Sequence, residues 1–265
     1  MKSKDVAIAI GLFLALILGC KMSDKTNVNR TTNTNASTSS PSTTSASNDG
    51  IITSGTGVEK EKPASDKGNV QGKVFYNSQP VKGVEVKLCE KFSQFVSGCS
   101  GETFATRTDD NGEYLLKNVT PRVYEGLLVR VFTTPYFVFA TSGIVQTAKY
   151  KIVPGATFFA PDTNLFKHDL KLVSPKASSK TGTSNIEVKW DAYPDAAYYK
   201  MSIYADTSSG AKPEYDFIGR KVEDTSFTTN KPLEPGTYNI KIEAYNSNDV
   251  KLASSADDHK FTVAN

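Results

Sequence analysis

The residues that could carry out chemistry are few, because the chain of 265 residues contains only two histidines and three cysteines. Neither His168 nor His259 lies near a serine or cysteine nucleophile motif, so a catalytic triad would have no recognisable base. The G-x-S-x-G, phosphate-loop and H-E-x-x-H patterns are absent from the sequence. Acidic pairs such as Asp109 and Asp110 fall in predicted turns, where solvated charge is the ordinary interpretation. We therefore expect a protein that is not an enzyme and that uses no cofactor or metal.

The N-terminus carries Lys2 and Lys4 before an apolar segment, Val6–Leu18, which is shorter than the roughly 20 residues of a membrane-spanning helix. This pattern is typical of a signal peptide. The segment ends in LILGC, which resembles the lipobox of bacterial lipoproteins. The resemblance implies a signal peptide over residues 1–19 and a diacylglyceryl group on the thiol of Cys20. The alternative is an ordinary signal peptide followed by an incidental cysteine.

A lipid on Cys20 implies attachment to a membrane of the cell envelope, because two or three acyl chains anchor a protein stably where one binds marginally. Lys21, rather than an aspartate, follows the cysteine, which resembles the outer-membrane pattern of Gram-negative lipoproteins. We expect a periplasmic or surface-exposed protein. The formal net charge is +3, and about +2 without residues 1–19, which does not favour a nucleic-acid partner.

The stretch from Ser23 to about Gly57 is dominated by serine, threonine and asparagine and contains no aromatic residue. Such a segment cannot bury enough apolar surface to offset the entropy lost on ordering. A charged stretch over residues 59–67 follows it. We predict a disordered tether over residues 20–67, whose root-mean-square reach as a flexible coil would be about 30–35 Å.

Apart from Cys20, the chain contains one pair of cysteines, Cys89 and Cys99. The N-terminus directs the chain to a compartment outside the cytosol, and disulfides persist in such compartments. We predict a disulfide between them, and two free buried thiols are the alternative. Closing so short a loop would stabilise the fold by about 2–3 kcal/mol. The cysteines and histidines together offer no recognised spacing for a zinc site.

The first folded segment shows the alternation of half-buried strands, with Val70, Gly72 and Val74 on one face, and a second alternating run over residues 84–88. The sequence TDDNG, over residues 108–112, predicts a tight turn, and calcium binding by its acidic side chains is the alternative. The G-x-V strand, QPVKGVEVKL, TDDNGEY and TPRVYEGLLVRV together resemble the carboxypeptidase regulatory-like family. The resemblance implies a non-catalytic, prealbumin-like β-sandwich over residues 68–171.

The second folded segment, residues 172–265, alternates strictly around Ile186, Val188 and Trp190. The single tryptophan, the LEPGTY sequence ending at Tyr238, and the AYNS sequence after it resemble the fibronectin type III domain. The resemblance implies that Trp190 lies in the core and that Tyr238 forms a tyrosine corner, with its hydroxyl bonded back to the chain. Stacking of Trp190 on a sugar is the alternative.

The sequence therefore predicts an all-β protein: two β-sandwich domains, prealbumin-like and immunoglobulin-like, in series behind a lipoprotein signal peptide and a disordered linker. We expect binding, adhesion or scaffolding without chemistry, with the membrane and an unknown protein or glycan as partners. Candidate contact residues are Tyr204, Tyr215 and Tyr245, which fall in loops or on the polar phase of the second domain. The alternative is an accessory subunit that holds polysaccharide or peptide substrate for an enzyme encoded elsewhere.

Overall fold

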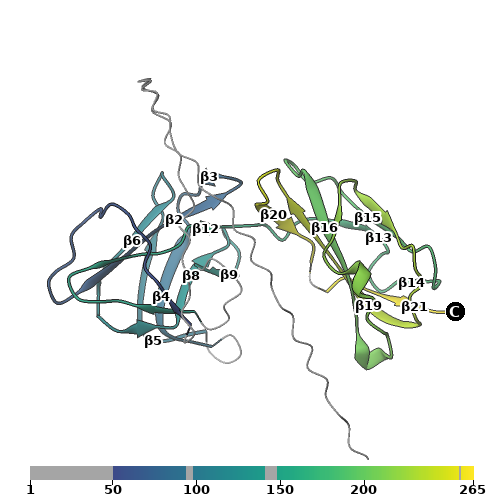
Figure 1. Cartoon of the computed structure of the whole chain (residues 1–265), viewed down its shortest axis with the longest axis horizontal. Helices are drawn as coiled ribbons and strands as arrows, with labels where there is room; N and C mark the ends of the chain where they lie inside the picture. Colours follow the sequence, from purple (N-terminus) through teal and green to yellow (C-terminus); the bar gives the residue numbers. More distant parts are fainter. Residues whose placement is uncertain (1–49, 94–97, 141–147, 257) are drawn as a thin grey trace, which may run out of the picture. The chain divides into compact units, whose positions relative to one another are not determined.

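The computed structural model describes residues 50–93, 98–140, 148–256 and 258–265, and these residues form β-strands with two short 3-10 helices. The predicted all-β fold class is confirmed. Two separate hydrophobic cores divide the strands into a first and a second sandwich, which Figure 1 shows in blue to teal and in green to yellow. The signal peptide, the lipidation site Cys20 and residues 20–49 of the predicted tether lie outside the described residues. None of the described helices has the length and apolar character needed to cross a membrane.

The first sandwich contains strands β1 to β12, which pair into three sheets. The β4 sheet has the order β5 (Gly98–Arg107), β4 (Glu85–Ser93), β8 (Gly126–Arg130) and β9 (Phe137–Phe139). The β2 sheet has β2 (Gly68–Tyr76) at its centre, paired with β3 (Gln79–Pro80), β6 (Glu113–Val119), β11 (Thr157–Phe159) and β12 (Thr163–Asn164). A small sheet joins β1 (Ile51–Ile52), β10 (Lys149–Lys151) and β7 (Val123–Tyr124).

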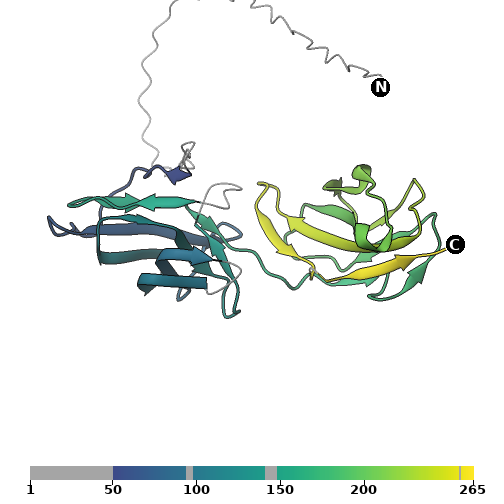
Figure 2. The same cartoon turned by 90° about the horizontal axis from the view of Figure 1, so that it is seen from below.

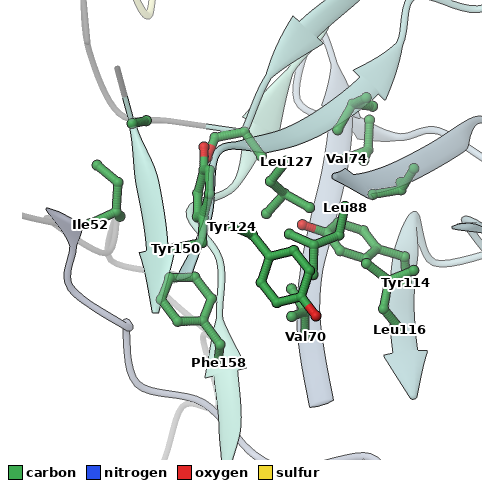
Figure 3. Packing of buried hydrophobic residues seen from close by; sticks show 14 of the residues in the cluster. Ile52, Val70, Val74, Leu88, Tyr114, Leu116, Tyr124, Leu127, Tyr150 and Phe158 are labelled. Atoms are coloured by element: carbon green, nitrogen blue, oxygen red, sulfur yellow. The ribbon is translucent and has the colours of Figure 1, made fainter. Parts of the chain in front are cut away.

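The core of the first sandwich is built from the residues that the alternation predicted to face inward. Val70 and Val74 of β2 and Leu88 of β4 are fully buried. Figure 3 shows them packed with large aromatic side chains, among them Tyr114, Tyr124, Tyr150 and Phe158. Gly72 makes room for one of these rings, because a Cβ atom at this position would lie 2.5 Å from the hydroxyl oxygen of Tyr114.

The predicted turn at TDDNG connects β5 to β6 and holds itself together. The Oδ1 atom of Asp109 accepts hydrogen bonds from the backbone N–H groups of Asn111 and Glu113, both at 2.9 Å. Gly112 has a φ of +69°, a left-handed conformation that glycine adopts without steric cost. This local bonding explains the acidic residue at the start of the turn without invoking a ligand.

The predicted disulfide between Cys89 and Cys99 is confirmed, with a Cα–Cα distance of 5.4 Å. It joins the neighbouring strands β4 and β5 near the end of their hairpin. A disulfide is typical of proteins outside the reducing cytosol, so it supports an extracytoplasmic location.

The predicted tether over residues 20–67 requires a correction, because residues 50–67 pack along the first sandwich. Ile52 of β1 is only 2% exposed and belongs to the first core. The ammonium group of Lys60 lies 2.6 Å from a carboxylate oxygen of Asp109, so part of the charged stretch forms ion pairs. Two adjacent isoleucines in a polar segment are too short a signal to predict a strand, yet they provide enough apolar surface to add β1 beside β10.

The second sandwich packs two sheets against each other, seen as layers of strands in Figure 2. The β15 sheet has the order β13 (Leu172–Ser174), β15 (Glu187–Trp190) and β18 (Ser226–Thr228). The β19 sheet has the order β14 (Lys180–Thr181), β21 (Lys260–Val263), β19 (Gly236–Tyr245), β16 (Tyr198–Ala205) and β17 (Arg220–Val222), with β20 (Lys251–Ser254) also paired to β19. The 3-10 helices η1 (Thr207–Ser209) and η2 (Tyr215–Phe217) lie between β16 and β17 in the chain. Leu165 still packs in the first core and Leu170 already packs in the second, close to the predicted boundary at residues 171 and 172.

The core of the second sandwich matches the interpretation of its tryptophan and tyrosine. Trp190 is 3% exposed and meets Tyr199 edge to face, with ring centroids 5.4 Å apart. The hydroxyl of Tyr238 donates to the carbonyl oxygen of Glu234, four residues earlier, at 3.0 Å. The first sandwich repeats this arrangement, because the hydroxyl of Tyr124 donates to a carbonyl four residues before it at 2.8 Å. Both tyrosines therefore fix the entry of the chain into a core strand.

Candidate binding face of the second sandwich

The outer face of the β19 sheet gathers aromatic and cationic side chains. Strand alternation directs Met201 and Ile203 of β16 into the core, where both are buried, and it directs Tyr198 and Lys200 to the opposite face. On β19 the same alternation buries Ile242 and turns its neighbours outward. We call the resulting surface the tyrosine–lysine face, which consists of Tyr198, Lys200, Lys221, Glu243, Tyr245 and Lys251.

Two tyrosines form the centre of the tyrosine–lysine face. Tyr198 of β16 and Tyr245 of β19 are direct partners in the antiparallel register. Their rings are stacked, with centroids 5.2 Å apart and planes only 4° from parallel. The hydroxyl of Tyr198 donates to Asp249 at 2.9 Å, and that of Tyr245 donates to Glu243 at 3.0 Å. Burial and the nearby carboxylates raise the pKa of both phenols, so both hydroxyls stay protonated at neutral pH.

Two lysines lie over these rings. The Nζ atom of Lys221 is 4.3 Å from the ring centroid of Tyr198, and that of Lys200 is 4.5 Å from the ring centroid of Tyr245. Both distances are within the range of a cation–π interaction. Lys200 and Lys221 are also direct cross-strand partners between β16 and β17. Neither is in ion-pair contact with a carboxylate in the part of the chain that the structure describes.

The acidic residue of the face is already paired. Glu243 accepts from the ammonium group of Lys251 at 2.5 Å. Burial alone would raise the pKa of Glu243, but the hydrogen bond and charge of Lys251 and the hydroxyl of Tyr245 outweigh it and hold the pKa below its usual value. Lys251 also lies over the ring of Phe166, 3.9 Å from the centroid. Glu243 is therefore ionised at neutral pH and forms an ion pair with Lys251 of β20, and it is also the direct cross-strand partner of Lys200.

The three tyrosines predicted as contact residues have different surroundings. Tyr245 lies on the tyrosine–lysine face, where stacking leaves it half-buried. Tyr204 is 42% exposed and follows on the same outward phase of β16, whereas Tyr215 is 78% exposed on η2. The sequence analysis missed Tyr198, Lys200 and Lys221. The outward phase of Tyr198 and Lys200 was visible in the alternation, but their cross-strand partners were not.

The two histidines lie outside the tyrosine–lysine face, and each has a ring nitrogen within hydrogen-bond distance of another group of the chain. The Nδ1 atom of His168 is 2.9 Å from the hydroxyl of Ser254, and the Nε2 atom of His259 is 2.6 Å from the carbonyl oxygen of Pro175. Among the described residues, no group of three or more histidine, cysteine, aspartate or glutamate side chains is placed to hold a metal ion. A hollow of about 350 Å³ lies between the β13–β14 connection and the start of β15, and serine, threonine and lysine side chains line much of it.

Known proteins resemble this chain only distantly. No family model matches the sequence, and no curated protein matches it. Solved structures match at low identity. A leucine-rich repeat protein from Bacteroides thetaiotaomicron is 14% identical, and the match covers 76% of this chain and 25% of that protein with a TM-score of 0.26. The major pilin SpaD from Corynebacterium diphtheriae is 12% identical (75% of this chain and 64% of the pilin, TM-score 0.26), and the fibronectin(III)-like modules of Clostridium thermocellum CbhA are 12% identical (73% of this chain and 89% of the modules, TM-score 0.25). The chain spans less than two thirds of the first two.

Proposed function

We propose that this chain is a non-catalytic, lipid-anchored protein of the cell envelope that binds a partner through the tyrosine–lysine face. The observation that carries the proposal is the pair Lys200 and Lys221, held over stacked tyrosines on an outer sheet face without a carboxylate partner among the described residues. Like charges directly opposite each other on neighbouring strands are destabilising. Two cations held side by side on an outer face would attract an anionic group of a partner.

The rest of the molecule supports a display role. Each sandwich has its own core, a tyrosine corner and a set of strands, and the disulfide suits a compartment outside the cytosol. Lipidation of Cys20 would hold the chain on a membrane, and residues 21–49 would separate the membrane from the first sandwich. Tyr204 and Tyr215 are exposed and remain candidates for additional contacts.

Attachment and function can be tested separately. The Cys20→Ala variant should appear in the soluble fraction while the unaltered chain stays with the membrane. Protease shaving of intact cells, compared with lysed cells, then shows whether the second sandwich faces outward. Retention of the Cys20→Ala variant in the membrane fraction would contradict the anchor.

Binding is tested by retention of the Cys20→Ala variant, which would carry no lipid, on washed cell-envelope preparations, and the changes below are made in that variant. Replacing Lys200 and Lys221 together by glutamine should abolish retention. The matched control is Lys189→Gln on the outer side of β15, where the lysine pairs with Glu187 at 2.8 Å. Equal retention of the double variant and the control would remove the tyrosine–lysine face from the proposal.

A second function is favoured by the same surface. Aromatic side chains beside cations suit carbohydrate as well as protein ligands, so the alternative function is that of an accessory subunit that binds polysaccharide or peptide substrate for a surface degradation system. Saturable binding to a polysaccharide that a neighbouring enzyme cleaves would favour this function over adhesion or scaffolding.

A further inference from the structure

We infer that the first sandwich contains a site for self-association, in which the open edge of β5 pairs antiparallel with β5 of a second copy of this chain. This edge belongs to a different sandwich from the tyrosine–lysine face, so the site goes beyond the proposed function and does not depend on it. Three features of β5 support it: the strand is paired on one side only, it lacks the usual protection of edge strands, and its residue order fits itself when reversed.

One edge of β5 is unpaired in the part of the chain that the structure describes. β5 is the outermost strand of the β4 sheet and pairs only with β4. Just past the end of β5, the N–H group of Thr108 donates to the carbonyl oxygen of Val84, and the carbonyl oxygen of Thr108 accepts from the N–H group of Gly83. Both backbone groups of Thr108 therefore point to the side on which β4 lies.

The backbone groups that point to the open side belong to three residues of β5. Successive residues of a strand alternate in the direction of their N–H and C=O groups, so alternation from Thr108 directs those of Thr103, Ala105 and Arg107 away from β4. All three residues are exposed. Another extended strand can therefore reach these groups and pair with them.

The open edge of β5 lacks the features that usually prevent edge strands from pairing. Natural edge strands are often very short, or they carry lysine or proline. β9, at the other edge of the same sheet, has only three residues, and the edge strand β6 carries Lys117. Between Thr103 and Arg107, β5 contains neither lysine nor proline. The guanidinium group of Arg107 donates to the carbonyl oxygen of Gly83 at 2.7 Å, so it lies on the β4 side and leaves the edge open.

The regular part of β5 is centred on Ala105. The register with β4 shifts around Gly101, which has a φ of +75°, and β5 ends at Arg107. The stretch Thr103–Arg107 is therefore uninterrupted. If two copies pair antiparallel along the whole stretch, Ala105 exchanges hydrogen bonds with Ala105 of the second copy, and Thr103 of each copy does so with Arg107 of the other. A two-fold contact requires a patch that fits itself in this way, which favours a second copy as the occupant of the edge.

The side chains that this register brings together are compatible. Phe104 of each copy lies opposite Thr106 of the other, and a pair of an aromatic and a β-branched residue is favourable on neighbouring strands. Phe104 is half-buried against the first core and meets Tyr124 edge to face, with ring centroids 6.1 Å apart, so the added strand would extend that core. On the outer face, Arg107 lies opposite Thr103. The register therefore places no like charges opposite each other.

Pairing of two short stretches makes a small contact. Stable protein interfaces bury about 1,200–2,000 Å² in total, more than one added strand of this length provides. We therefore expect a reversible dimer. Copies held on one membrane by the proposed anchor would have a high effective concentration and would pair more readily than in solution.

The test is sedimentation equilibrium of the full-length Cys20→Ala variant, which would carry no lipid, over a wide range of concentrations. We expect a reversible equilibrium between monomer and dimer. Adding Ala105→Pro removes the central N–H group of the open edge, which pairing with β4 does not use, and should raise the dissociation constant about tenfold or more. The matched control is Ser226→Pro at an exposed position of the edge strand β18, where the N–H group also points away from the neighbouring strand β15. This control should leave the dissociation constant unchanged, and circular dichroism verifies that each variant is folded.

The register is tested with a nitroxide label on Ala105→Cys in the same background. In the dimer, the two Cα atoms at this position would lie about 5.5 Å apart, as in any hydrogen-bonded antiparallel pair. The labelled dimer should therefore show strong dipolar broadening of its electron paramagnetic resonance spectrum, and dilution with unlabelled chain should remove it.

A chain that stays monomeric at every concentration would overturn the inference and leave a foreign extended peptide as the occupant of the edge. A dimer that Ala105→Pro does not weaken, or a labelled dimer without dipolar broadening, would assign the contact to another surface and would overturn the inference as well. These results are independent of envelope retention through Lys200 and Lys221, so a failure of the proposed function is measured separately.

Discussion

Replacing Tyr238 by phenylalanine isolates one hydrogen bond in the second core. The ring of Tyr238 is 1% exposed, and its hydroxyl donates to the carbonyl oxygen of Glu234 at 3.0 Å, with the carbonyl oxygen of Lys212 at 3.3 Å. Phenylalanine keeps the packing of the ring and removes only the hydroxyl. The change therefore tests whether the tyrosine corner stabilises the sandwich or is merely compatible with it.

The expected cost is about 1 kcal/mol, the usual net contribution of an intramolecular hydrogen bond. The larger penalty for an unsatisfied buried group is not expected, because Glu234 and Lys212 are exposed residues. For a domain of this size, a loss of 1 kcal/mol lowers the midpoint of thermal unfolding by about 4–8 °C.

The assay uses a probe that the sequence provides. Trp190 is the only tryptophan in the chain and is buried in the second core, so its fluorescence reports the unfolding of the second sandwich. Tyr124→Phe, which removes the matching hydroxyl in the first sandwich, is the control and should leave the Trp190 transition unchanged. An unaltered midpoint for Tyr238→Phe, or an equal shift for both variants, would refute the reasoning.

Three further changes act on the first sandwich, whose unfolding can be followed by circular dichroism in urea. Replacing Cys89 and Cys99 together by alanine should cost about 2–3 kcal/mol, and adding a reductant should then have no further effect. Gly72→Ala should lower the free energy of unfolding by about 1–3 kcal/mol, because the added methyl group would overpack against the hydroxyl of Tyr114. Tyr114→Phe in the same chain should restore part of this stability, because it removes a hydroxyl that has no hydrogen-bond partner among the described residues. A hydrogen bond from Arg130 is the main reason that the pKa of Glu85 is lowered. The ionised carboxylate of Glu85 therefore stabilises the fold fully above its unfolded-state pKa, and this contribution is lost as the pH falls through the lower folded-state pKa. The stability difference between the unaltered chain and Glu85→Gln should shrink accordingly between neutral pH and pH about 3; a difference that is constant with pH would contradict the assignment.

Much of the fold could be predicted because a strand's alternation is a local property. Val70 and Val74, or Val188 and Trp190, reveal their inward face within a few residues of sequence, and both pairs are buried as expected. Tyr238 was interpretable because its turn sequence and its hydrogen-bond acceptor lie within four residues of it. Features of this kind depend little on what the rest of the chain does.

The candidate site was predicted only in part because it depends on pairing between distant segments. Tyr198 and Tyr245 are 47 positions apart, and only the register of β16 with β19 brings their rings together. Likewise, Lys200 meets Lys221 only because β17 returns beside β16 after the two 3-10 helices. A polar alternation reveals that such residues face outward, but it does not specify their neighbours.

The parallel pairings at the ends of each sandwich have a mechanical consequence. In the first sandwich, β2 runs parallel to β11 and β12, and in the second, β14 runs parallel to β21. When an early strand and a late strand of one sandwich run in the same direction, a load that pulls the two ends of that sandwich apart acts along the strands. The hydrogen bonds between them are then sheared together instead of being opened one after another. Each of these parallel pairs would therefore resist tension that acts along its strands.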